Sequence, residues 1–178
     1  MPKLEILEIE GNKINKISDD VYKFRNLLKI NISNNHFDIF PKELARIESI
    51  EEIYLSDNKI KKIGPEIKEF KKLKILSLHN NLIRSLPEEF GELENLEYLY
   101  LWDNMIEELP ESLYKMNNLI DLDLENNKLK SIPKILQNIP DLKSLNLFGN
   151  KELVIPSWLW STGFEERVDV KYSEENLL

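Results

Sequence analysis

The chain has 178 residues, of which 42% are apolar and 31% charged, with a formal net charge of −8 and no cysteine. This length favours one domain, and the lack of cysteine excludes disulfides, thiolate zinc sites and cysteine nucleophiles. The charge is uneven, because residues 1–89 carry 16 basic and 15 acidic side chains whereas residues 90–178 carry 8 and 17. The strongly acidic second half argues against binding to nucleic acid or to anionic membrane surfaces.

The sequence shows no signal peptide and no apolar stretch long enough to span a membrane. Residues 1–3 instead lead directly into the first predicted strand. We therefore expect a cytoplasmic protein or one exported by a route that needs no signal peptide, and the compartment stays open between these two.

An asparagine recurs every 23 residues along the chain. The positions are Asn12, Asn35, Asn58, Asn81, Asn104, Asn127 and Asn150. A leading apolar residue keeps the same step, at Leu4, Leu27, Ile50, Leu73, Leu96, Leu119 and Leu142. Such regularity indicates stacked structural repeats. The asparagines are expected to point inward and to bond backbone groups of neighbouring coils, because buried polar groups need partners.

Each repeat has two halves with different periods. The alternation in Leu76-Ser77-Leu78 is typical of a strand with one buried face. Farther on, Pro87 is followed by Phe90 and Leu93, a spacing of three that indicates a short helix or 3₁₀ turn beginning after proline. The sequence thus predicts an α/β solenoid with one parallel strand in each coil.

The segment from Leu96 to Ile106 reads L-x-x-L-x-L-x-x-N-x-I. On this motif, residues 4–164 resemble the leucine-rich repeat family, and most closely its 23-residue class, which is common in bacterial proteins including those of spirochaetes. The resemblance implies a horseshoe with parallel strands on the concave face and short helices or 3₁₀ turns on the convex face. It also implies binding to other macromolecules, usually proteins, rather than catalysis.

The predicted domain covers residues 1–178, with seven repeats over 4–164, a degenerate capping strand over 165–172 and a tail over 173–178. Adding 23 to Leu145 and Leu147 places Val168 and Val170 in register in the capping strand.

The aromatic residues Trp158, Trp160 and Phe164 precede this strand. We expect them to cover the last core, with a binding role as the alternative.

The first repeat begins without a polar cap. An uncovered edge strand can pair with another chain, so weak self-association through the N-terminal edge is predicted. Two alternatives remain. Charged residues such as Glu5 and Glu8 could blunt the edge, or the chain could be a fragment with further repeats upstream.

Catalytic signals are absent from the sequence. The two histidines, His36 and His79, have no supporting nucleophile, and the five glycines form no phosphate-binding loop. His79 aligns with Asp57 and Asp103 of adjacent coils, but three such side chains are too few for a dedicated metal site. We predict no enzyme activity, no cofactor and no metal.

The outward positions of the strands carry the candidate site. Strands stack about 4.8 Å apart, so equivalent positions in adjacent repeats are neighbours. Repeats three to five bring together Tyr54, Ile75, His79, Tyr98, Tyr100 and Trp102; the flank consists of Asp121, Asp123 and Glu125, with Phe148 beyond it.

Exposed aromatic residues on a sheet are typical of interface hot spots. We predict a protein partner with a basic rim around an apolar anchor. One alternative is cross-strand stacking that only stiffens the sheet. Another is a carbohydrate- or cell-wall-binding role for the same patch. For a bacterium with a host, family analogy would add a role in host interaction.

Overall fold

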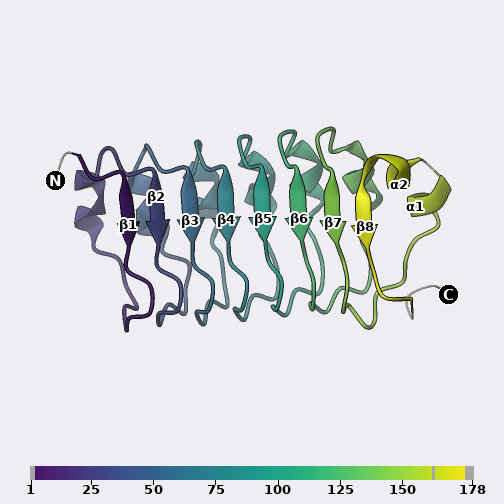
Figure 1. Cartoon of the computed structure of the whole chain (residues 1–178), viewed down its shortest axis with the longest axis horizontal. Helices are drawn as coiled ribbons and strands as arrows, with labels where there is room; N and C mark the ends of the chain where they lie inside the picture. The colour runs from purple at the N-terminus through teal and green to yellow at the C-terminus, as the bar shows by residue number, and fades with distance from the viewer. Residues whose placement is uncertain (1–2, 162, 175–178) are drawn as a thin grey trace.

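The computed structural model describes residues 3–161 and 163–174. Eight parallel strands form one sheet in sequence order (Figure 1). The strands are β1 (Ile6–Glu8), β2 (Lys29–Asn31), β3 (Glu52–Tyr54), β4 (Ile75–Ser77), β5 (Tyr98–Tyr100), β6 (Asp121–Asp123), β7 (Ser144–Asn146) and β8 (Asp169–Lys171). None of the helices in this described part of the chain has the length and apolar character needed to cross a membrane.

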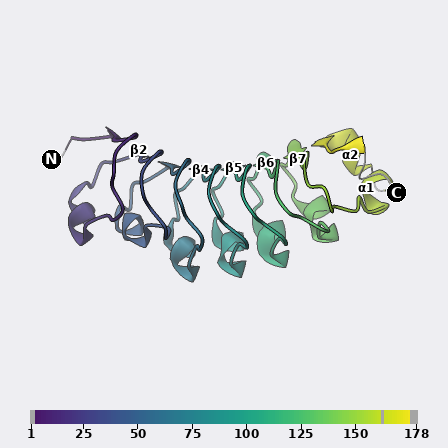
Figure 2. The same ribbon diagram turned by 90° about the horizontal axis from the view of Figure 1, so that it is seen from below.

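Short 3₁₀ turns connect the strands on the opposite side of each coil. They are η1 (Asp19–Lys23), η2 (Lys42–Arg46), η3 (Pro65–Glu69), η4 (Glu88–Glu92), η5 (Glu111–Lys115) and η6 (Lys134–Asn138). Two short helices, α1 (Trp158–Ser161) and α2 (Phe164–Arg167), precede β8. Figure 2 shows the strands on the inner side of a shallow arc and the turns on its outer side. The predicted horseshoe, with parallel strands on its concave face, is therefore confirmed.

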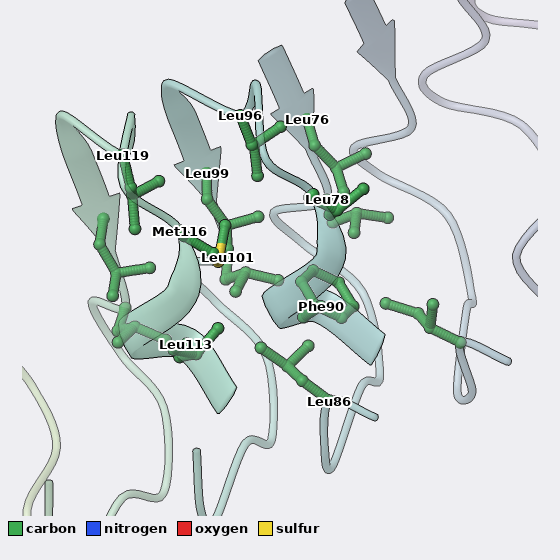
Figure 3. Close-up of a cluster of buried hydrophobic side chains, with 14 of the residues drawn as sticks. Leu76, Leu78, Leu86, Phe90, Leu96, Leu99, Leu101, Leu113, Met116 and Leu119 are labelled. Carbon is green, nitrogen blue, oxygen red and sulfur yellow. The ribbon is translucent and has the colours of Figure 1, made fainter. Parts of the chain in front are cut away.

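The core is one continuous stripe between the sheet and the turns. In Figure 3, Leu76 and Leu99 of the strands face Phe90 and Met116 from the outer side, and all four side chains are fully buried. Turn η4 begins directly after Pro87, which serves as its N-cap residue in an extended conformation. Each coil buries its apolar face against its neighbours, as expected for a solenoid.

The predicted asparagine ladder is present inside the coils. The side chain of Asn104 accepts a hydrogen bond from the Ile83 N–H at 3.0 Å and donates to the carbonyl oxygens of Leu78 and Leu101, both at 3.0 Å. The same pattern recurs at Asn35, Asn58, Asn81, Asn127 and Asn150. The first member, Asn12, differs because it is exposed and donates to the carbonyl oxygens of Ile9 and Glu10 in its own repeat.

A second ladder was not predicted. The residue before each ladder asparagine has a positive φ of 50° to 74°, and it is always Gly, Asn or Asp: Gly11, Asn34, Asp57, Asn80, Asp103, Asn126 and Gly149. These residue types tolerate the left-handed conformation that the turn requires. The side chain of Asn80 also donates to Asp57 at 2.9 Å, and that of Asn126 to Asp103 at 3.0 Å.

The register of the capping strand corrects the sequence prediction. Leu145 lies opposite Val170, not opposite Val168 as the 23-residue step predicts. The reason is that α1 and α2 replace the single 3₁₀ turn of the other repeats and use two more residues. A shift of two residues preserves the face to which each side chain points, and Val168 is buried just before β8.

The aromatic residues before β8 do cover the last core in part. Trp158 packs edge-on against the buried Phe164, with ring centroids 5.6 Å apart. Trp160 is 41% exposed and packs instead against Tyr172. Ser173, the first residue of the predicted tail, is buried and accepts a hydrogen bond from the Gly149 N–H, so it packs against the last repeat. Residues 175–178 lie outside the described part of the chain.

At the other end, β1 pairs with β2 alone among the described residues. Ile6 is 55% exposed there. Self-association through this edge stays a prediction.

Candidate interaction surface on the concave face

Strand register places the predicted surface columns side by side. Ile75 is the register partner of Tyr98, which in turn pairs with Asp121. Ser77 and Asp123 flank Tyr100 in the same way. Neighbours inferred from the 23-residue step on the concave face are therefore neighbours in space.

The centre of the face is a cluster of rings on β4, β5 and the turns after them. Tyr100 meets Trp102 edge-on with centroids 5.7 Å apart, and Tyr98 lies 6.4 Å from Tyr100. The His79 imidazole stacks on Trp102 at 3.7 Å with only 7° between the ring planes. We call these four residues, together with Ile75, the aromatic patch. All five side chains are half-buried, so part of each faces solvent.

Tyr54 belongs to a different group of contacts. Its hydroxyl donates to Glu52 at 3.0 Å, and the Lys29 ammonium lies 5.0 Å from its ring centroid. Burial, and next the hydrogen bond to Glu52, raise the pKa of Tyr54 to about 12. Its ring takes part in none of the ring contacts of the aromatic patch within the described residues, but Tyr54 and Tyr100 both pair with Ser77 in the strand register. Tyr100 also contributes to the raised pKa of Tyr54. A joint binding role for the six residues stays a prediction.

His79 is held on both sides of its ring. Its Nδ1 lies 3.0 Å from the Ser77 hydroxyl, and its Nε2 lies 3.9 Å from an Asp57 carboxylate oxygen. Burial lowers the pKa of His79, and the charges of Asp57 and Asp103 offset this only in part. The imidazole is therefore neutral at pH 7, and its contact with Asp57 is no ion pair. No group of three His, Cys, Asp or Glu within residues 3–161 and 163–174 could hold a metal ion.

The predicted acidic flank, Asp121, Asp123 and Glu125, borders the aromatic patch along β6. Asp123 accepts a hydrogen bond from the Glu125 N–H at 3.0 Å. Burial raises the pKa of Asp123, although this bond and one from the Asn146 amide lower it in part. None of the three carboxylates forms an ion pair with a basic side chain among the described residues.

Phe148 lies apart from the aromatic patch, at the C-terminal end of the face, and is 50% exposed. It borders a hollow of about 530 Å³. The hollow is lined by Glu125, Asn146, Phe148, Val170, Lys171, Tyr172 and Glu174. Sequence reasoning missed Tyr172 and Glu174, because both follow the strand whose register departs from the 23-residue step.

A second hollow of about 670 Å³ lies off the concave columns, at the edge of repeats one to three. Ile17, Ile39 and Phe40 contribute its apolar lining. It forms where Gly64 stands at the position that is proline in the later repeats, as at Pro87. Three lysines and three acidic residues line it, so its charges balance.

Comparisons with known proteins identify the repeat. Residues 61–155 match a family model described as a leucine-rich repeat region, and residues 2–60 match a second one described as leucine rich repeat. The chain belongs to the leucine-rich repeat family. Domains of this family generally mediate protein–protein interaction and are typically binding modules without catalytic activity. No curated protein has a significant match to the sequence.

Solved structures of the same fold come from bacteria and plants. A leucine-rich repeat protein of Leptospira interrogans is 27% identical, with a TM-score of 0.71 over 94% of this chain and 48% of that one. The plant peptide hormone receptor RGFR1, solved in complex with RGF2, is 25% identical, with a TM-score of 0.71 over 97% and 32%. Internalin C2 of Listeria monocytogenes shares the fold, with 21% identity and a TM-score of 0.80 over 94% and 70%. The chain thus spans less than half the length of the first two proteins.

Proposed function

We propose that this chain is a non-enzymatic module whose concave face binds a partner protein. In this proposal the aromatic patch is the apolar anchor, and the acidic flank meets a basic rim on the partner. The observation that carries the proposal is the row Tyr98, Tyr100 and Trp102, three large rings that one strand and its turn present outside the core. Tyr and Trp are the residue types that most often dominate the binding energy of interfaces.

The ring contacts favour a binding surface that is already ordered. His79 and Tyr100 both contact Trp102, so its indole has little freedom to lose when a partner docks. A side chain that is ordered before binding reduces the entropic cost of association. The same stacking stiffens the sheet, but stiffening alone gives no reason to place a half-exposed Trp and two Tyr side by side.

The acidic flank supports the second part of the proposal. Asp123 is partly buried, and this burial disfavours its charged form. A carboxylate held in this way without an internal cation is complementary to a positive group on a partner. The plant receptor solved in complex with RGF2 offers a parallel for ligand binding by a related solenoid.

The test compares variants of two faces. Tyr100→Ala with Trp102→Ala alters the patch, and Tyr22→Ala with Tyr114→Ala removes two similarly exposed tyrosines from the 3₁₀ turns of the convex face. Partners captured from a lysate of the source organism by the unaltered chain would be purified and titrated by calorimetry. Loss of Trp102 should weaken binding by at least about 2 kcal/mol, or roughly thirtyfold, in a chain that circular dichroism shows to be folded at the temperature of the titration.

The control variant should bind like the unaltered chain. Equal binding by both double variants would place the interface elsewhere and disprove the proposal. If a glycan array instead gives a defined sugar whose binding is lost with Trp102, the ligand is a carbohydrate and not a protein.

A further inference from the structure

The hollow beside Phe148 lies apart from the aromatic patch and is lined by other residues. Three successive coils build it: Glu125 follows β6, Asn146 and Phe148 belong to β7 and its turn, and residues 170–174 belong to β8 and the segment after it. Its volume of about 530 Å³ exceeds that of a single side chain. The hollow can therefore admit one long side chain of a partner together with some of that partner's backbone.

Two aromatic rings line this hollow. Phe148 lies in the turn after β7 and is 50% exposed, so its ring fills no part of the core. Tyr172 is partly buried, and its ring packs edge-on against Trp160 with centroids 5.4 Å apart and 70° between the planes. This contact with Trp160 holds the Tyr172 ring in place, so the aromatic lining exists before any ligand arrives.

The polar lining of the hollow is mostly acidic. It carries the carboxylates of Glu125 and Glu174 against one ammonium group, that of Lys171. The Asn146 amide donates to Glu125 at 2.9 Å and accepts from the Phe148 N–H at 3.2 Å, so the Glu125 carboxylate is fixed on the wall. Neither glutamate nor Lys171 forms an ion pair within the described residues.

Aromatic faces beside carboxylates recognise one chemical group particularly well. A guanidinium is planar, stacks on aromatic rings and donates paired hydrogen bonds to carboxylates. We propose that the hollow holds the guanidinium of an arginine of the partner, stacked on Phe148 and Tyr172 and paired with Glu125 and Glu174. This inference rests on the proposed function, since the partner is the protein that occupies the aromatic patch.

The geometry of the sheet also gives the spacing of the partner's residues. Trp102 follows β5 and Phe148 follows β7 at the same repeat position, so two strand spacings of about 4.8 Å separate the two residues by roughly 10 Å. An extended chain advances about 3.3 Å per residue. The partner segment should therefore cross the strands with an aromatic or apolar anchor and an arginine about three residues apart.

The chain contains its own control for the key carboxylate. Glu10 occupies the column of Glu125 at the N-terminal end, and it accepts a hydrogen bond from the Asn31 amide just as Glu125 does from Asn146. Glu10 follows β1 at one end of the sheet, whereas the hollow lies at β6 to β8 near the other end. Glu10→Gln therefore makes the same chemical change in the same local setting without touching the proposed site.

The first experiment selects ligands from a displayed library of random 12-residue peptides. Peptides that bind the unaltered chain should carry arginine about three residues from Trp, Phe or Leu. Replacing that arginine with citrulline, which keeps the shape but removes the charge, should weaken binding at least tenfold. Glu125→Gln and Phe148→Ala should each weaken the arginine peptide several-fold and the citrulline peptide little, and Glu10→Gln should change neither.

Selected peptides that need Trp102 but bind equally well with citrulline would overturn the arginine site and leave the proposed function intact. A second experiment tests the hollow without any anchor, by NMR titration with N-acetyl-arginine amide. Its expected result is a shift of the Phe148 and Tyr172 ring signals that N-acetyl-citrulline amide does not produce. Absence of that shift in the millimolar range would overturn the site. Its presence, with no peptide depending on Trp102, would uphold the hollow and disprove the proposed patch.

Discussion

The interior of the coils and the concave face follow the same 23-residue step but use it in opposite ways. Inside, the same residue type returns at each coil, as with Asn81, Asn104 and Asn127, and each forms the same hydrogen bonds. On the face, the column of Tyr100 changes from tyrosine to aspartate in the next coil. The repeated asparagines inside hold the coils together by the same hydrogen bonds in each coil. On the face, the residue type changes from coil to coil, so one region becomes aromatic and the next acidic.

The two regions also differ in what their polar side chains contribute to the stability of the fold. Every interior Asn satisfies buried backbone groups and so stabilises the fold. On the face, Asp123 carries a charge that burial disfavours. We expect substitutions in the interior to lower stability and some substitutions on the face to raise it.

The largest change in the free energy of unfolding is expected from Asn104→Ala. This change leaves the buried Ile83 N–H without its acceptor and removes one donor to each of the Leu78 and Leu101 carbonyls. A buried donor left unsatisfied costs about 1–3 kcal/mol, so the free energy of unfolding should fall by that amount. Urea unfolding followed by circular dichroism measures it.

The matched control is Asn12→Ala, which changes the same repeat position where the side chain is exposed. It should cost less than about 0.5 kcal/mol. Equal losses from both variants would mean that the ladder does not derive its stability from burial, and the comparison would fail.

Asp123→Asn is expected to raise the free energy of unfolding, whereas Asn104→Ala lowers it. The amide oxygen can still accept from the Glu125 N–H, as the Asn31 and Asn146 side chains do for the residues two positions ahead of them. Because the folded pKa of Asp123 is raised, its charge destabilises the fold above that pKa. At pH 7 the variant should be more stable by about 0.5 kcal/mol, within the usual range for surface substitutions.

The pH dependence of Asp123→Asn provides its check. The gain should be constant near neutral pH and should vanish as pH falls below the folded pKa, where the native carboxyl is protonated too. If the proposed function holds, the same variant should bind a basic partner more weakly. A variant that loses stability at pH 7 would show that the Asp123 charge is compensated within the fold.

The sequence was sufficient to predict the fold and the concave columns because both depend on one strict period. The register of β2 to β7 follows the 23-residue step at every position. The left-handed turn ladder obeys the same step, and the alternation of Asn34, Asp57 and Asn80 could have revealed it. The glycines alone do not reveal this ladder, because Asn and Asp adopt the same left-handed backbone conformation at most of its positions.

Most features that the sequence did not predict lie at the C-terminal end, where the 23-residue period stops. The two helices before β8 shift its register by two residues, and no spacing in the earlier repeats encodes that shift. Tyr172 and Glu174 reach the hollow only because of this local geometry. The contacts of Tyr54 were also unpredictable, since ring orientations depend on side-chain packing and not on columns.

The smallest effect concerns the pH dependence of the aromatic patch. Burial lowers the folded pKa of His79 below its ordinary value near 6.5, so the unfolded chain binds a proton more readily than the folded one. Stability is therefore complete above about pH 6.5 and decreases as pH falls towards the folded pKa. In His79→Gln this decrease should be absent, although the variant starts from a lower stability because its stack with Trp102 is lost.

Thermal unfolding between pH 7.5 and pH 5.5 tests whether His79 makes the fold less stable as the pH falls. The melting temperature of the unaltered chain should fall more over this range than that of His79→Gln, since the two chains differ only at residue 79. Protonation would turn the ring into an imidazolium that the charges of Asp57 and Asp103 stabilise, which limits the fall. If the unaltered chain instead gained stability on acidification relative to the variant, those two carboxylates would outweigh burial. The patch would then bind its partner as a charged surface at low pH.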